Sequence, residues 1–430
     1  MTASLAPQYA RALIVTNSAG SSGGARTRRS QHWGSVLAAL LCVLLSRHVL
    51  ADEPGFHPFS LDVHGFVSQG FMLSSSNNYL TNSRRGSFEL TEVGINFTKT
   101  ITDDLSVGMQ LFMRDLGPIG NYKPQFDWAY LDYHFRDWLG FRAGRTKLPF
   151  GLYNDQADID AARVPVLLPQ SVYPTNERDF LLAQTGFELY GYERLPALGA
   201  LDYRVYGGTI FIDQTTLASP AATVNKIDVP YVVGGRLLWR APTPLDGLTL
   251  GGSAQALRIN IDYSLSAGAL AALAQKYMLP ANFNGRFKYE LPAFLWVGSL
   301  EYAAHDILLA AEYSRWRLGR ELRPEIVPDS DATQTRWYVM GSYRAASWMS
   351  PGAYYSVLNS GVAGPLTRDK YQQDFAVTTR FDINQNWLVK LEGHYMRGTA
   401  ALDSTLNSNI ALGELSRVWG VFMAKTTAYF

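Results

Sequence analysis

The sequence is almost without cysteine and has few candidates for catalytic or metal chemistry. Its single cysteine, Cys42, lies in the N-terminal 51 residues, so the rest of the chain has none. That absence excludes disulfides and thiolate metal sites, and it suits a chain exported through an oxidising compartment. The histidines after residue 51 show no H-E-x-x-H spacing, and no G-x-S-x-G motif occurs there. We therefore expect no cofactor, no metal and no enzymatic activity.

Long apolar runs and a basic excess are also missing. No apolar run beyond the N-terminus reaches the roughly 18 residues that a membrane helix needs, although 47% of residues are hydrophobic and 13% aromatic. The apolar residues are instead spread in short alternating pieces. Residues 52–430 hold 33 Lys and Arg against 37 Asp and Glu, so nothing indicates a nucleic-acid partner.

The first 51 residues have the pattern of a secretory signal peptide. They contain five arginines and no acidic residue, and an apolar run from Val36 to Leu45 is followed by Val49, Leu50 and Ala51. We expect cleavage after Ala51 and exclude residues 1–51 from the fold. The remaining residues 52–430 are predicted to form one domain, because a β-barrel of this size folds as a single unit.

Sixteen period-2 segments follow, and their connections alternate between short and long. A transmembrane antiparallel β-barrel with an even strand number, short periplasmic turns and longer external loops produces this alternation. The predicted strands are 61–73, 86–99, 102–115, 125–135, 138–147, 183–195, 200–211, 229–240, 247–258, 291–303, 306–318, 335–345, 349–358, 371–382, 386–397 and 415–430.

Within these strands one face is apolar and the other carries charge. Val389 and Leu391, for example, alternate with Lys390 and Glu392. Arg or Lys turned toward lipid near the midplane would cost about 2–4 kcal/mol each, so we expect the charged face to line a lumen. Aromatic residues near strand ends, Trp128 and Trp387 among them, are expected to lie at the two membrane–water boundaries.

The longest connection, residues 148–182, carries Pro149, Pro165, Pro169 and Pro174 together with five acidic residues against two arginines. Loops of this length are usually functional or disordered. We expect it to fold into the barrel as a constriction. Another long connection, 259–290, contains the helix-like run LSAGALAALAQKYMLP, whose apolar face would cover the barrel mouth or a neighbouring protomer.

The predicted pore-lining and constriction residues are charges of both signs. They are Arg114, Asp132, Arg142, Asp155, Asp158, Asp160, Glu188, Arg336, Arg344 and Arg380. Two interpretations stay open: acidic loop residues facing basic wall residues set up a transverse field on passing solutes, or the charges pair to keep the lumen wet and the loop fixed.

The C-terminal strand ends on Phe430, behind VFMAKTTAY. With the signal peptide and the sixteen-strand pattern, this ending resembles the Gram-negative outer-membrane porins. The resemblance implies an outer-membrane location, a terminal aromatic read by the barrel-assembly machinery, and a third external loop that narrows the pore. The segment GRTKLPFG, residues 144–151, is similar to a strand end of phosphate-selective porins, which keeps anion or phosphate selectivity as an alternative.

We therefore predict a passive channel for small hydrophilic solutes or ions, embedded in outer-membrane lipid. An outer-membrane enzyme is the less favoured alternative, and a TonB-type receptor is excluded because about nine residues separate Asp52 from the first strand, too few for a plug. A homotrimer is expected because Arg145 and Lys147 fall on the outward parity, where a partner subunit would satisfy them.

Overall fold

The computed structural model describes residues 61–212, 221–276, 279, 283–325, 328–362, 364–403, 405–407 and 414–430. The expected signal peptide and its cleavage site after Ala51 lie outside these residues. Across the described ranges, no helix combines the length and the apolar character that crossing a membrane requires.

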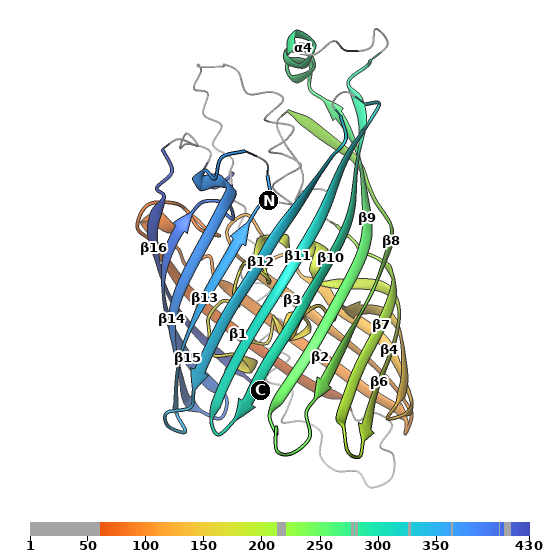
Figure 1. Cartoon of the computed structure of the whole chain (residues 1–430), viewed down its shortest axis with the longest axis vertical. Coiled ribbons are helices and arrows are strands. Elements are labelled where there is room, and N and C mark those ends of the chain that lie inside the picture. The colour runs from red at the N-terminus through yellow and green to blue at the C-terminus, as the bar shows by residue number, and fades with distance from the viewer. Residues whose placement is uncertain are drawn as a thin grey trace, which may run out of the picture. The chain divides into compact units, whose positions relative to one another are not determined.

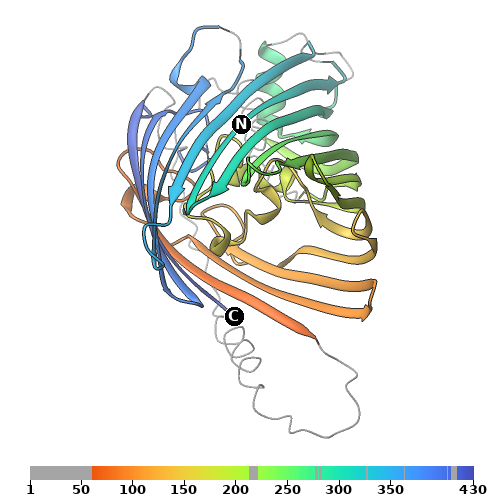
Figure 2. The same ribbon diagram turned by 60° about the horizontal axis from the view of Figure 1, so that its bottom comes forward.

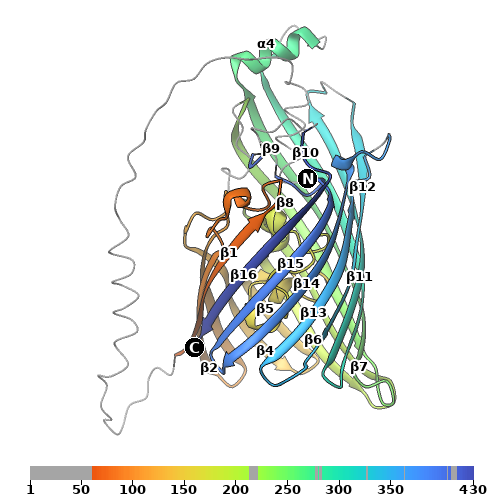
Figure 3. The same ribbon diagram turned by 90° about the vertical axis from the view of Figure 1, so that its left-hand side faces the viewer.

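The described residues form sixteen antiparallel strands that close into a barrel (Figure 1), as the sequence predicted. Each strand pairs with its neighbours in the chain, and β1 closes the ring on β16, with Phe66 opposite Tyr429 (Figure 3). The strands are β1 Asp62–Ser74, β2 Thr91–Thr102, β3 Leu105–Asp115, β4 Gln125–Arg136, β5 Leu139–Lys147, β6 Ala183–Leu195, β7 Gly199–Thr209, β8 Ala222–Arg240, β9 Leu248–Leu265, β10 Arg286–Ala304, β11 Ile307–Arg323, β12 Ser330–Tyr343, β13 Met349–Asn359, β14 Tyr371–Asn384, β15 Trp387–Gly398 and β16 Val418–Tyr429.

The connections alternate as predicted, except that the connection 324–329 after β11 is shorter than the turn 241–247 after β8. Short turns follow the even strands, for example 103–104, 137–138 and 305–306, and define what we call the turn end of the barrel. Longer connections follow the odd strands at the opposite, loop end. The long connection after β9 contains helix α4, Ala267–Lys276, which confirms a helix in the Ala/Leu-rich run (Figure 1).

Charged side chains point inward and apolar side chains point outward in the band near the turn end. On β15, Lys390 and Glu392 are 0% and 1% exposed, whereas Leu391 and Tyr395 are 41% and 53% exposed. A soluble barrel would bury the apolar set and expose the charges. The inverted sorting is the one that a lipid-facing barrel requires.

Toward the loop end of β9–β11 this sorting reverses. Inward Leu257, Ile259 and Ile261 are buried, while outward Arg258 pairs with Glu290 at 2.9 Å. On the neighbouring connection the Arg323 guanidinium donates hydrogen bonds to Asp329 and lowers the pKa of that carboxyl. The apolar outer band therefore ends part-way up these strands, and their upper portion has a water-facing outer surface.

The reversal explains where our strand boundaries were wrong. β8 to β12 are longer than predicted, so that β9 runs to Leu265 and β10 begins at Arg286, inside the expected loop 259–290. Figure 1 shows these strands as a tall part of the wall. The outward Arg, Asn and Asp residues of this portion look like loop residues in the sequence, because the pattern that we followed assumed an apolar outer face. In the other direction, β2 starts at Thr91 rather than at residue 86.

Trp128 is also placed differently from the expectation. It shares the inward parity of β4 with Asp132, and its indole N–H donates to Gln110 Oε1 at 3.0 Å. It therefore belongs to the lumen wall rather than to an interfacial belt. Outward aromatic residues that fit the belt are Phe135, Trp138, Tyr343, Trp348 and Trp387 near the turn end, all exposed by 44–54%.

Candidate channel constriction

Residues 148–182, between β5 and β6, lie within the ring of strands, where Figure 2 shows them in yellow. They form only short helical pieces: η3 Asn154–Gln156, η4 Asp160–Ala162, η5 Thr175–Glu177 and α3 Arg178–Leu181. Their conformation is held by the barrel wall at four places. We call these the four anchors.

The first anchor is the carboxylate of Glu312 on β11. It accepts hydrogen bonds from Leu152 N at 2.9 Å, Tyr338 Oη at 2.8 Å and Ser299 Oγ at 2.5 Å, and also from the hydroxyl of Tyr173. Next to it Gly151 has φ +64°, and a Cβ there would lie 2.5 Å from Tyr173 Oη. The glycine lets the chain turn against this carboxylate.

The second anchor is Asp160, which is 1% exposed. Its Oδ1 lies 3.0 Å from Lys390 Nζ and 3.3 Å from Lys425 Nζ, and Thr427 Oγ1 donates to its Oδ2 at 2.7 Å. Lys425 reaches Glu92 as well, at 2.6 Å. These charges are buried but paired and hydrogen-bonded, which is the condition under which buried charge is tolerated.

The third anchor is Glu392, which accepts from Val166 N at 2.6 Å and Leu167 N at 3.2 Å. His394 Nε2 lies 3.0 Å from Glu392, and His394 Nδ1 lies 2.9 Å from Asp374. A histidine between two carboxylates is suited to a structural role, because both ring nitrogens have acceptors.

The fourth anchor is Arg336, which is 1% exposed. Its guanidinium pairs with Glu177 at 3.0 Å, donates to Ser171 O at 3.1 Å and lies 3.5 Å from the centroid of the Trp316 ring. The planar guanidinium stacks on the ring while its fixed set of N–H donors reaches the carboxylate and the carbonyl, whereas an ammonium group is a compact point charge.

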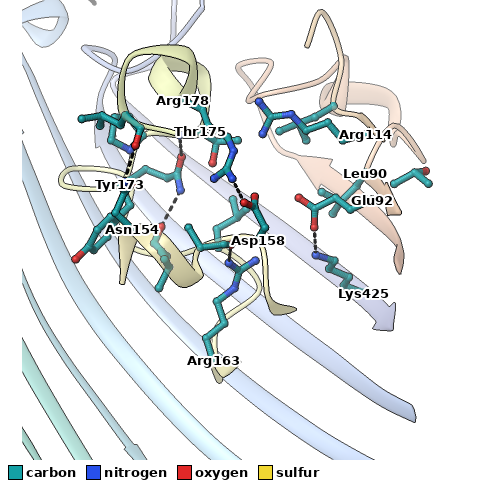
Figure 4. Close-up of a pocket in the computed structure, with 18 of the residues that line it drawn as sticks. Leu90, Glu92, Arg114, Asn154, Asp158, Arg163, Tyr173, Thr175, Arg178 and Lys425 are labelled. Atoms are coloured by element: carbon teal, nitrogen blue, oxygen red, sulfur yellow. Dashed lines mark hydrogen bonds and ion pairs between the residues drawn. The ribbon is translucent and has the colours of Figure 1, made fainter. Parts of the chain in front are cut away.

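Asp158 joins the loop to the end of β5. It pairs with Lys147 at 2.8 Å and with Arg178, and Lys147 also reaches Asp127 at 2.9 Å. Figure 4 shows Arg178 pointing toward Asp158, with Lys425 and Glu92 paired nearby. The outward placement expected for Lys147 is therefore wrong. An extra residue of β4, Asp127, stands at a register shift and supplies an inward partner.

The remaining predicted acidic residues pair with arginines of β5, β7 and β8. Asp155 lies 3.3 Å from both Arg204 and Arg236. Nearer the turn end, Arg142 on β5 lies 2.9 Å from both Asp132 on β4 and Glu188 on β6. Among these residues the predicted charges pair with each other, which favours the fixing interpretation while leaving a mixed-charge surface beside the loop.

The last three predicted residues are arginines with different surroundings. Arg114 is buried and lines the small cavity of Figure 4 with Asp158 and Arg178. Arg380 pairs with Asp382 at 2.6 Å and donates to the carbonyl of Ala161, whereas Arg344 is exposed. Arg344, Arg380 and Arg163 line a cavity of about 490 Å³ beneath the loop, together with Asp306 and Asp382.

Sequence reasoning missed the wall partners as members of this site. These partners include Lys390, Lys425 and Glu312, whose loop partners are 139 to 265 residues away in the chain, and nothing local signals such pairs. In the described part of the chain, no cluster of three His, Cys, Asp or Glu residues is arranged to hold a metal ion.

Many solved structures match most of the chain at low identity, and three of them are outer-membrane proteins of different bacteria. OmpT of Vibrio cholerae matches with a TM-score of 0.54 at 12% identity, covering 89% of this chain and 100% of that one. Salmonella typhi OmpF in complex with daunomycin gives 0.53 at 13%, covering 86% and 97%. An anion-selective porin from Comamonas acidovorans gives 0.51 at 9%, covering 86% and 99%. The chain has the porin fold. No protein-family model matches the sequence, and no curated protein matches it either.

Proposed function

We propose that this protein with a porin fold is an outer-membrane channel for passive diffusion of small hydrophilic solutes, narrowed by residues 148–182. The observation that carries the proposal is the sorting of side chains: a closed sixteen-strand ring has charges such as Lys390 and Glu392 inside and Leu391 and Tyr395 outside. Sixteen strands enclose a lumen wide enough for water. A charged interior keeps that lumen wet, and the outer band suits lipid.

The test is reconstitution of the purified barrel into planar bilayers. We expect stepwise conductance increases in salt solution, and liposomes containing the protein should swell in small sugars but not in large ones. A correctly folded barrel that gives no conductance steps and no swelling would refute the channel.

Anion or phosphate selectivity is the second candidate. It is favoured by the cavity beneath the loop, where Arg163, Arg344 and Arg380 face two carboxylates. The segment GRTKLPFG does not add to it, since Lys147 is engaged by Asp127 and Asp158. The reversal potential in a salt gradient discriminates: a value near zero supports a general pore, and a large one of anionic sign supports selectivity.

An enzymatic role has little support at the buried histidine of the lumen. A hydrolase of the serine class needs a nucleophile hydrogen-bonded to the base, whereas both nitrogens of His394 face carboxylates. We therefore propose a channel without enzymatic activity, through which solutes or ions pass unchanged.

We also propose a homotrimer in outer-membrane lipid, although the two residues expected to need a partner subunit have partners within the chain. Lys147 has inward partners, and Arg145 donates to the carbonyls of Phe126 and Asp127. Light scattering of the detergent-solubilised protein, corrected for bound detergent, distinguishes a trimer from a monomer.

A further inference from the structure

Five planar side chains lie one after another along the inner wall of β4, β5 and β6. Trp128 and Tyr130 have ring centroids 5.1 Å apart, and the Arg142 guanidinium lies 5.0 Å from the Tyr130 centroid and 4.3 Å from that of Tyr190. His134 stacks on Tyr190 at 6.4 Å. We call Trp128, Tyr130, Arg142, Tyr190 and His134 the planar row.

Two glycines, which have no Cβ, leave space on the wall for two rings of the row. A Cβ on Gly140 would lie 2.2 Å from Cζ of Tyr190, and one on Gly108 would lie 2.9 Å from Cζ3 of Trp128. Any larger residue at Gly140 would therefore push the phenol ring away from β5. The wall leaves space for these rings to lie against its backbone.

The planar row is open to the lumen. His134 is exposed and the other four members are partly exposed. The four anchors hold the loop against β11, β12, β15 and β16. The loop also contacts β5, β7 and β8, but through Lys147, Arg204 and Arg236, none of which belongs to the row. Beyond Tyr190 the row reaches a cavity of about 190 Å³ lined by Tyr192, Asp202 and Arg204. That volume is below the roughly 300–1,000 Å³ of drug-sized sites, and it suits a single sugar ring.

The charges around the planar row are of both signs and mostly paired. Arg142, Arg204, Arg236 and Arg240 pair with Asp132, Glu188, Asp155 and Asp202. A fifth carboxylate, Asp137, lies 3.4 Å from His134 of the row. Paired charges of this kind leave little net attraction for a free anion or cation. The site offers paired donors and acceptors beside aromatic surfaces, which is the combination that matches vicinal hydroxyls and the apolar C–H face of a pyranose ring.

We propose that the planar row is a carbohydrate-binding track, on which a neutral saccharide moves from the constriction toward the turn end. The inference rests on the proposed channel, and it specifies the class of solute. Aromatic contact retains the sugar weakly, and successive rings would allow it to pass from one to the next without leaving the wall.

The test measures binding separately from conduction. Maltotriose is titrated into the folded, detergent-solubilised protein, and saturation-transfer NMR reports contact with the sugar protons. We expect binding by the unchanged protein, a loss of affinity of about tenfold for Trp128→Ala and for Tyr190→Ala, and near-normal binding for Tyr190→Phe, which keeps the ring. Tyr395→Ala, which removes an outward ring on β15, is the matched control and should bind normally.

The heat-modified mobility of each variant shows that it has folded. Absence of maltotriose binding by the unchanged protein, tighter binding of inorganic phosphate than of maltotriose, or unchanged binding by folded Tyr190→Ala would each overturn the carbohydrate track. None of these results depends on conductance, so a protein that binds maltotriose but does not conduct refutes the channel alone.

Discussion

Asp160 and Asp331 are both acidic residues in ion pairs, but because one pair is buried and the other exposed, they contribute differently to stability. Asp160 and its partners Lys390 and Lys425 are at most 2% exposed, whereas Asp331 and Arg317 have side chains 53% and 69% exposed. Removing one member of a buried pair leaves an uncompensated charge. Exposed pairs contribute little, because water and salt screen them.

We predict that Asp160→Asn destabilises the barrel by about 3–5 kcal/mol, since two buried ammonium groups lose their carboxylate. The temperature at which the unheated gel form converts to the unfolded form should fall. Asp331→Asn is the control and should leave this temperature nearly unchanged, because water and salt screen its exposed pair with Arg317. Equal conversion temperatures for the two variants would contradict the role of Asp160 as an anchor.

Asp155 differs again, because it lies 3.3 Å from two arginines, Arg204 and Arg236, and is only partly buried. We predict that Asp155→Asn shifts ion preference toward anions, measured as a change of reversal potential in a salt gradient. The shift should shrink as salt rises, because the Debye length falls from about 10 Å at 0.1 M to about 3 Å at 1 M. A shift toward cations, or none at low salt, would show that ions do not pass this residue.

At the scale of elements, the loop 148–182 is the segment that our constriction hypothesis depends on. We predict that deleting residues 155–175 raises single-channel conductance and admits larger solutes, because the second and third anchors and most of the loop within the ring are removed. Polymers of graded size, added to the bilayer chamber, measure the exclusion limit. Conductance and exclusion limit that stay unchanged in a folded deletion variant would mean that the wall, and not the loop, sets the narrowest cross-section.

The sequence was informative where charged and apolar residues alternate along a whole strand, and it was misleading where that alternation changes. Alternation around Lys390 and Leu391 predicted both the strand and its inward face, and the same reasoning led to the sixteen strands of the closed ring. At Arg258 the outer surroundings change from apolar to aqueous, so the upper parts of β9 and β10 were assigned to a loop. The pairing of Asp160 with Lys390 joins residues 230 apart, and one sequence contains no signal for such a contact.

For the whole molecule, closure of the ring predicts resistance to detergent. Every strand has a hydrogen-bonded neighbour on each side, so no edge is open to competition from solvent or detergent. We predict that unheated and boiled samples migrate at different positions on a detergent gel. Identical migration would count against a closed barrel.

The pairing of β1 with β16 has a consequence for how the molecule forms. Phe66 and Tyr429 meet across the seam although they come from opposite ends of the described chain, and Gly65 exchanges backbone hydrogen bonds with Phe430 beside them. Among the described residues, the contacts of this seam therefore include the pair farthest apart in sequence. The entropy of closing so long a segment is lost before its hydrogen bonds are gained. Until then β1 and β16 each present an unpaired edge, and the time spent in that state is when the chain is most prone to aggregate. The seam is thus a kinetic feature: it makes the last strand, near Phe430, the part of the chain on which completion of assembly depends.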